Sequence, residues 1–206
     1  GRAIVRALAS EGWTVAFTWR ERGEEARRLA GELGDAALPF RLDLLDRARP
    51  GNLVAEVEER VGPIAGWVNN AGVRRDALLA ALPDNAWDEI LDANLGWVFR
   101  CCRAVVPRML SRRAGSIVNI SSLTAVRGVA GQAAYGAAKA GILGFTKALA
   151  QEVIRKGVTV NAVSPGYVET EMVAAIREDV KQQIVAQIPA GRLGRPEEIA
   201  EMVNYL

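Results

Sequence analysis

The alternation of short strand-like segments with longer helix-like segments restricts this chain to one broad class of fold. The residues that read as strands are 13–19, 36–44, 64–68, 116–121 and 158–164, and helical patterns occupy 1–12, 22–34, 53–62, 84–112, 132–156, 170–188 and 196–206. Strands that alternate with helices indicate βαβ units, in which helices cover both faces of a parallel sheet. The sequence therefore predicts a single α/β domain over residues 1–206, arranged as three α/β/α layers.

The composition of the chain removes several classes of function. A net charge of +2 over 206 residues gives no global reason to expect binding to nucleic acid or to a membrane surface. No apolar run reaches membrane-spanning length, and no signal-peptide pattern is visible. The two cysteines, Cys101 and Cys102, are adjacent and do not suit a disulfide framework, which favours a reducing cytoplasm. Because the chain has no histidine, it lacks the commonest general base and metal ligand, and no metal site is expected.

Small, polar and backbone-shaping residues follow three of the predicted strands. These segments are "NNAG" (69–72), Ser121–Ser122 and "PGYVET" (165–170). Ligands bind beyond the carboxyl ends of the strands in open α/β sheets, so residues in this position are informative about function. Loops between strands and helices need turn residues in any case. Three such segments at one edge of one sheet nevertheless favour a binding site over ordinary turns.

Tyr135 and Lys139 are four residues apart, which places both on the same face of the predicted helix 132–156. A phenol with the usual pKa of about 10 transfers protons poorly at neutral pH, and a neighbouring ammonium lowers that pKa. Taken alone, the pair fits a partly buried tyrosine beside a surface lysine better than a catalytic pair. The alanines and glycines around this helix allow close approach on several faces, which predicts a subunit interface here.

Asn94 lies on the apolar face of the predicted helix 84–112. A buried amide must be hydrogen-bonded, because an unsatisfied one costs free energy. Two interpretations remain open at this point. The amide could bond a backbone carbonyl as a packing residue, or it could open the helix slightly and hold a water near the site.

The ordered set of these motifs resembles the short-chain dehydrogenase/reductase family over nearly the whole chain. The set comprises "NNAG", Asn94, Ser122, Tyr135-x-x-x-Lys139 and "PGYVET". The segments "RRDALL" (74–79), "YGAAKAGILGFTKALAQEV" (135–153) and "IPAGRLGRPEEIAE" (188–201) look most like 3-oxoacyl-acyl-carrier-protein reductases, with acetoacetyl-CoA reductases as close neighbours. The resemblance implies a Rossmann-type, doubly wound parallel sheet.

The resemblance also implies a role for each candidate catalytic residue. Tyr135 is expected to donate a proton to the substrate carbonyl oxygen, and Ser122 to hydrogen-bond that oxygen. Lys139 is expected to lower the pKa of Tyr135 and to hold the nicotinamide ribose hydroxyls. Asn94 is expected to anchor a water that relays protons through Lys139. The hydride comes from the nicotinamide, which explains acid–base catalysis without histidine.

By the same resemblance, a set of residues is expected to contact the dinucleotide. The set is Gly1, Arg20, Asp43, Leu44, Asn70, Ala71, Gly72, Tyr135, Lys139, Pro165, Gly166, Val168 and Thr170. For Asp43, a surface acid at a strand end is a serious alternative. The strand 13–19 ends without an acid and is followed by Arg20, which suits the 2′-phosphate of NADP; Glu21 tempers this preference over NAD.

The chain departs from the family pattern at both ends. Family members open with a strand and a glycine-rich turn that cradles the pyrophosphate, and only Gly1 corresponds to the last glycine of that turn. The sequence also stops before an expected last strand. We interpret the chain as a fragment of a longer gene product that lacks the first and last strands. Strands 13–19 and 36–44 are therefore expected to have no neighbour that joins them to the rest of the sheet.

Three functions remain under consideration. The leading hypothesis is NADPH-dependent reduction of a 3-oxoacyl thioester, carried by an acyl carrier protein or by CoA, to the 3-hydroxyacyl thioester. The second is an NAD(P)-dependent dehydrogenase of a sugar, polyol or other secondary alcohol. The third is a non-catalytic cofactor-sensing or scaffold protein on the same fold.

The partners and the substrate region follow from the leading hypothesis. We expect a homodimer or homotetramer formed through helices 84–112 and 132–156, and a mobile substrate lid over 170–195. The apolar residues of the lid that suit a fatty chain are Met172, Val173, Ile176, Ile184 and Ile188. An acyl carrier protein is acidic, so the candidate docking residues are Arg112, Arg113, Arg155 and Lys156.

Overall fold

The five predicted strands are all present in the computed structural model, which describes residues 1–170, 173 and 177–206. They are β1 (Val15–Trp19), β2 (Ala37–Arg41), β3 (Gly66–Asn69), β4 (Gly115–Ile120) and β5 (Val158–Val163). Each lies within a few residues of the expected boundaries. Every pairing between neighbouring strands is parallel, as the alternation of strands and helices predicts.

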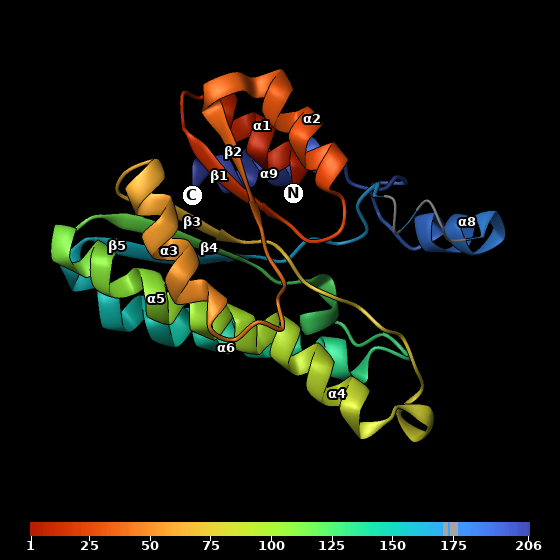
Figure 1. The fold of residues 1–206 in the computed structure, drawn as a ribbon. Helices are drawn as coiled ribbons and strands as arrows, with labels where there is room; N and C mark the ends of the chain where they lie inside the picture. Colours follow the sequence, from red (N-terminus) through yellow and green to blue (C-terminus); the bar gives the residue numbers. More distant parts are fainter. Residues whose placement is uncertain (171–172, 174–176) are drawn as a thin grey trace.

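The strands form two separate sheets. β1 pairs with β2, while β3, β4 and β5 form a second sheet in that order. In the part of the chain that the structure describes, no strand pairing joins the two sheets, which confirms the expectation for the first two strands. A cavity of about 920 Å³ lies where β1 faces β3, and its lining includes Phe17, Trp67 and Val68. Figure 1 shows the β1–β2 pair with α1 and α2 on one side of the molecule and the larger sheet on the other.

The described helices are α1 (Arg2–Ser10), α2 (Gly23–Leu33), α3 (Arg49–Arg60), α4 (Asp84–Leu91), α5 (Trp97–Arg112), α6 (Ala133–Val153), α8 (Glu178–Ala186) and α9 (Pro196–Tyr205). Helices α1 and α9 cover one face of the larger sheet and α3, α5 and α6 cover the other, whereas α2 packs on β2. Along β4, Ile117 packs in the core with α3, α5 and α6, whereas Val118 and Ile120 pack with α1 and α9. Side chains alternate between the two faces of a strand, so this pattern confirms a three-layer α/β/α arrangement around β4 (Figure 1).

The predicted helix 84–112 is continuous but contains one widened turn. Residues Asp92–Gly96 form a single π-helical turn between α4 and α5. π-turns of this kind are uncommon and occur often at functional sites. Asn94 lies within the turn and is almost completely buried.

The predicted helix 170–188 and the lid 170–195 are only partly described. Residues 171–172 and 174–176 lie outside the described residues, and with them Met172 and Ile176. Helix α8 occupies the remaining part of the prediction and extends away from the rest of the fold (Figure 1). An isolated parallel bridge between Val168 and Gly194 joins the segment after β5 to the segment before α9. Among the described helices, none combines the length and the apolar character that a membrane crossing requires.

Gly157, which connects α6 to β5 through a short 3-10 turn, offers a test of this packing. Its φ is +75°, and a Cβ at this position would collide with the carbonyl oxygen of Arg113. Gly12 has a similar φ of +87°, but a Cβ there would meet nothing within 4 Å. We expect Gly157→Ala to lower the free energy of unfolding by about 2–4 kcal/mol, and Gly12→Ala by about 1 kcal/mol. Urea-induced unfolding measures both losses, and equal losses would contradict the collision.

Candidate active site

Four of the predicted catalytic residues converge at the carboxyl ends of β3 and β4. Tyr135 and Lys139 lie in the first two turns of α6, and Ser122 is the second residue after β4. Asn94 approaches from the π-turn, beside the loop that follows β3. The elements that position these side chains come from separate parts of the sequence, and the parallel pairing of β3 with β4 brings their loops together.

Lys139 is deeply buried, with only 4% of its surface exposed. Its Nζ donates a hydrogen bond to the carbonyl oxygen of Ile120 at 2.8 Å, so the ammonium is held against the end of β4. Burial disfavours the charged form and lowers the pKa of Lys139 to about 8. The side chain is therefore close to its titration point near neutral pH, which suits a group that passes protons.

Tyr135 does not have the lowered pKa that the sequence predicted. Its ring lies over Lys139, with Nζ 5.6 Å from the ring centroid, rather than with the ammonium at the hydroxyl. Burial is the largest influence and raises the pKa of Tyr135, and Asp76 raises it further; a hydrogen bond with Ser122 and the charge of Arg74 lower it. The predicted lowering of this pKa by Lys139 is not found: burial of the phenol outweighs the groups that lower the pKa, and these groups are Ser122 and Arg74.

The two adjacent serines after β4 have different roles. The Ser122 side chain hydrogen-bonds Tyr135 and accepts a hydrogen bond from the backbone N–H of Thr124 at 3.2 Å. Ser121 is buried, and its Oγ donates to the carbonyl oxygen of Lys139 at 2.8 Å. Ser121 thus links α6 to the end of β4, whereas Ser122 interacts with the Tyr135 side chain.

The structure confirms the packing interpretation of Asn94 and, of the second interpretation, the opening of the helix. Its Nδ2 donates to the carbonyl oxygens of Ile90, at 2.8 Å, and Val73, at 2.9 Å, so it is a packing residue that joins the helix to the loop after β3. The helix is also opened at this point, as the π-turn shows. The buried Oδ1 accepts no hydrogen bond from the residues that the structure describes. It is therefore an acceptor that faces the space beside Lys139.

Gly72 defines the space between Asn94 and Lys139. A Cβ added to Gly72 would lie 2.5 Å from Asn94 Oδ1 and 3.6 Å from Lys139 Nζ. Only glycine leaves this space open, because contacts of a real Cβ at 2.5 Å essentially do not occur. The unpaired Asn94 Oδ1, the buried Lys139 amine and the space left by Gly72 lie together near the ends of the strands. These features are expected where a protein holds a polar ligand or a water.

The remaining residues predicted to contact the dinucleotide lie after the strands and at the start of α1. Arg20 follows β1 and pairs with Glu21 at 2.7 Å, and Asp43 follows β2, where its Oδ1 accepts from the backbone of Leu45 at 3.0 Å. Leu44 is buried, whereas Thr170 is exposed at the edge of the described region. The others lie at the start of α1 or in the loops after β3 and β5: Gly1, Asn70, Ala71, Gly72, Pro165, Gly166 and Val168.

These positions are consistent with a nucleotide site. A Cβ on Gly1 would lie 3.3 Å from the Asn70 amide nitrogen, so the start of α1 adjoins the loop after β3. Backbone N–H groups at the start of a helix favour anions such as phosphate. Together with the Gly72 cradle and the unpaired Asn94 oxygen, the donor set fits a nicotinamide dinucleotide.

Sequence reasoning missed a buried hydrogen-bond chain beneath the site. Asn69 of β3 donates to Asn119 Oδ1 of β4 at 2.8 Å, and Asn119 in turn donates to Thr146 Oγ1 of α6 at 2.9 Å. The indole N–H of Trp67 donates to Asn69 Oδ1 at 2.8 Å. The signal in the sequence was an asparagine near the end of each of two strands that were expected to be buried.

Comparison with known proteins agrees with the fold. A family model described as enoyl-(acyl carrier protein) reductase matches residues 1–206. Nodulation protein G of Azospirillum brasilense is 45% identical over 211 residues, covering 100% of this chain and 85% of that protein. The 3-oxoacyl-acyl-carrier-protein reductase FabG of Escherichia coli is 42% identical over 207 residues, with 100% and 84% covered. The acetoacetyl-CoA reductase of Shinella zoogloeoides is 44% identical over 207 residues, with 100% and 85% covered.

The α/β fold, the family match and the named relatives identify an oxidoreductase that uses a nicotinamide cofactor. The chain belongs to the short-chain dehydrogenase/reductase family, whose members are NAD(P)-dependent enzymes acting on CH–OH or C=O groups.

The buried state of Lys139 predicts how the stability of the fold depends on pH. The folded pKa of about 8 lies below the model value of 10.5, so the cost of burying the charge is fully present below pH 8 and is relieved as the pH rises to 10.5. We expect the unfolding free energy of the wild type, relative to Lys139→Met, to rise by about 3 kcal/mol over this range.

Urea unfolding of both proteins at the two ends of the range measures this difference. Lys147→Met is the matched control, because Lys147 is exposed on the same helix. Its difference from the wild type is expected to change little with pH. A flat difference for Lys139→Met would contradict the burial of a charge that titrates near pH 8.

Proposed function

We propose that this enzyme reduces a 3-oxoacyl thioester, carried by an acyl carrier protein or by CoA, to the 3-hydroxyacyl thioester with NADPH. The observation that carries the proposal is the convergence of Tyr135, Ser122, Lys139 and Asn94 at the strand ends. The names of the relatives in Escherichia coli and Shinella zoogloeoides support an oxoacyl thioester as substrate.

The two hydroxyl groups of the site bind the substrate carbonyl. Ser122 and Tyr135 already hydrogen-bond one another, so a carbonyl oxygen between them would accept from both. Burial keeps the Tyr135 phenol protonated at neutral pH, and a protonated phenol is what a proton donor requires. A bound nicotinamide would supply the hydride to the carbonyl carbon.

Lys139 and Asn94 restore the proton that Tyr135 gives up. With its pKa near 8, Lys139 exchanges a proton readily at neutral pH. Asn94 Oδ1 can hold a water in the space kept open by Gly72, next to Lys139 Nζ. This arrangement links the buried amine to water without a histidine.

We favour NADPH over NADH because of Arg20. The residue stands directly after β1 and is about half exposed, and its guanidinium can exchange Glu21 for a 2′-phosphate. An exposed ion pair of this kind contributes little stability, so releasing it costs little. The residues after β2, β3 and β5 that adjoin the site, together with Gly1, form the rest of the proposed dinucleotide contacts.

We also propose that the enzyme works in the cytoplasm as a homodimer or homotetramer. Both cysteines are buried free thiols, and burial raises the pKa of Cys102 to about 12, so they are inert and suit a reducing compartment. Helix α6 exposes a row of small residues, Ala133, Ala137, Ala140, Gly144 and Ala148, beside which a second copy could pack closely. On α5, Phe99 is 44% exposed, which adds apolar area to the same pair of helices.

Three cations near the ends of α5 and α6 form the proposed docking surface for an acyl carrier protein. Arg113 has a left-handed backbone conformation after α5, and its guanidinium donates to the carbonyl oxygen of Arg155, which precedes Lys156. All three are exposed, and none has an ion pair with another described residue. An acidic partner could therefore approach them directly.

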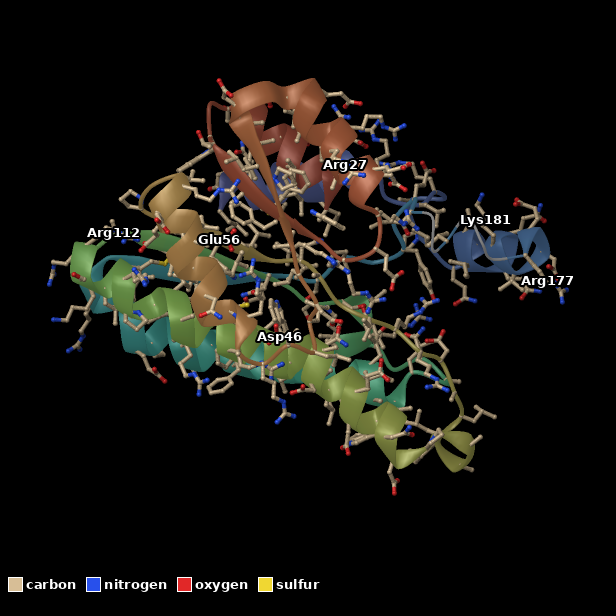
Figure 2. The ribbon with its side chains drawn as sticks, viewed as in Figure 1. Arg27, Asp46, Glu56, Arg112, Arg177 and Lys181 are labelled. Atoms are coloured by element: carbon tan, nitrogen blue, oxygen red, sulfur yellow. The ribbon has the colours of Figure 1, made fainter. Side chains whose placement is uncertain are left out.

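Arg112, the fourth candidate for docking, is used inside the protein. It pairs with Glu58 of α3 at 3.0 Å and donates to the carbonyl oxygen of Ile64 at 2.8 Å. Figure 2 shows Arg112 at the end of α5, beside α3. We therefore leave Arg112 out of the proposed docking surface.

Tyr135→Phe tests the central proposal. Removing one hydroxyl is expected to lower kcat for NADPH-dependent reduction of an acetoacetyl thioester by about 100- to 10,000-fold, because the proton donor is lost. The loss of NADPH absorbance measures the rate. Tyr205→Phe is the control, since Tyr205 is 86% exposed and far from the site in the sequence, and it is expected to retain full activity. Full activity of Tyr135→Phe would exclude Tyr135 as the donor.

Charge reversal tests the docking surface separately. Arg113→Glu combined with Lys156→Glu is expected to raise KM for a carrier-bound substrate about tenfold, from two exposed charge pairs of about 0.7 kcal/mol each. KM for a small acetoacetyl thioester is expected to stay unchanged. Arg27→Glu combined with Arg28→Glu is the control, because these two exposed changes on α2 alter the net charge by the same amount. If both substrates lose affinity equally, the docking proposal is wrong.

A further inference from the structure

A pair of opposite charges outside the four residues of the proposed mechanism lies next to the start of α6, the helix that carries Tyr135. Arg74 and Asp76 belong to the loop that follows β3, and Arg74 Nε lies 3.2 Å from Asp76 Oδ1. Arg74 is the less exposed of the two, with 27% of its side chain accessible against 44% for Asp76. The mechanism derived so far uses neither residue.

The loop that carries this pair is attached to the start of α6. The backbone N–H of Ala77 donates to the carbonyl oxygen of Gly131 at 2.9 Å. The side-chain amide of Gln132 donates to Asp76 Oδ2 at 3.2 Å. Gln132 is the residue that precedes α6, three positions before Tyr135. The Asp76 carboxylate is therefore held on one side by Arg74 and on the other by the helix that carries the phenol.

The same attachment reaches the loop of Ser122. Gln132 Oε1 accepts a hydrogen bond from Thr124 Oγ1 at 3.1 Å, and the backbone N–H of Thr124 donates to Ser122 Oγ at 3.2 Å. A continuous set of hydrogen bonds thus runs from Asp76 through Gln132 and Thr124 to Ser122. These hydrogen bonds connect the position of the Asp76 carboxylate to that of the Ser122 hydroxyl, which interacts with Tyr135.

We propose that Arg74 and Asp76 are positioning residues that act on the Tyr135 hydroxyl in opposite senses, Arg74 favouring release of its proton and Asp76 favouring its retention. The proposal rests on the function proposed for Tyr135 as proton donor. Gln132 takes part by holding the Asp76 carboxylate at a fixed place beside α6.

The charges around Tyr135 support this assignment. Arg74 lowers the pKa of Tyr135 and Asp76 raises it. On α6 itself, the Lys139 ammonium bonds the carbonyl oxygen of Ile120, and in the π-turn Asp92 is paired with Arg47 and Arg100. The remaining charged groups of the neighbouring segments are exposed to solvent: Arg75 in the same loop, Asp84, Asp88 and Glu89 on α4, Arg127 after the Ser122 loop, and Glu169 after β5.

The opposed pair gives the site two useful properties. Asp76 helps to keep the phenol protonated before reaction, as a donor must be. Arg74 stabilises the negative charge that remains on Tyr135 once the proton has left. Because the two charges are paired with each other, the Arg74–Asp76 pair itself adds no net charge to the site.

Measuring the ionisation of Tyr135 directly tests the proposal without turnover. The chain has three tyrosines, so labelling with difluorotyrosine gives few fluorine NMR signals, and Tyr135→Phe assigns one of them. The ionisation constant of Tyr135 is expected to fall about three- to tenfold in Arg74→Gln and to rise by a similar factor in Asp76→Asn. The double variant is expected to lie close to the wild type.

The controls separate an electrostatic effect from a structural one. Arg75→Gln removes the adjacent, exposed arginine and is expected to leave the Tyr135 titration unchanged. Arg74→Lys keeps the charge and is expected to restore most of the wild-type value. High salt should reduce the shifts, because exposed charges are screened. Shifts of the same sign in Arg74→Gln and Asp76→Asn, or no shift in either, would overturn the proposal.

A second readout connects the pair to catalysis. The pH profile of kcat for thioester reduction is expected to move in the same directions as the NMR titration. If the NMR signals shift as expected while the rate profile stays fixed, the charge pair acts on Tyr135 but Tyr135 is not the proton donor. An enzyme that reduces no thioester at all would refute the proposed function and leave the NMR result to judge the charge pair.

Discussion

A chain of buried hydrogen bonds holds the active-site region together. Asn69, Asn119 and Thr146 link β3 to β4 and β4 to α6 through side chains that are removed from water. A buried polar group that loses its partner costs roughly 1–3 kcal/mol, so these residues favour one arrangement of the two strands and the helix. The loops after β3 and β4 and the first turns of α6 carry the candidate site, and they inherit their positions from this arrangement.

Because the chain has no histidine, proton transfer at the site depends on side chains that ordinarily titrate far from neutral pH. Burial acts on both groups of the Tyr135–Lys139 pair in useful directions. It lowers the pKa of Lys139 toward neutral pH and raises that of Tyr135, which keeps the phenol protonated. The two residues thus differ in function because the same low-polarity surroundings disfavour a positive charge on one and a negative charge on the other.

The strands, the main helices and the convergence of the catalytic candidates could be predicted, because periodicity and strand-end loops report on local structure and topology. The direction of the Tyr135 pKa shift was predicted wrongly. Spacing places Lys139 on the right face of the helix, but only three-dimensional packing shows that its ammonium bonds the end of β4. The Asn69–Asn119 link was missed for a related reason, since the register of two strands separated by a long helix cannot be read from either strand alone.

The π-turn at Asp92–Gly96 links the position of the Asn94 side chain to the packing of α5 against the core. One additional residue in a helical turn rotates everything that follows by roughly 100° about the helix axis. The buried face of α5, which includes Cys101, Val105 and Met109, is therefore in register with the core only while the turn remains wide. A deletion that restored a regular helix would move each later residue of α5 to the position of its predecessor. Arg103 would then replace Cys102 in the core, and Leu110 would replace Met109. The packing of α5, a helix of about four turns, therefore also fixes the position of the Asn94 amide beside the active site.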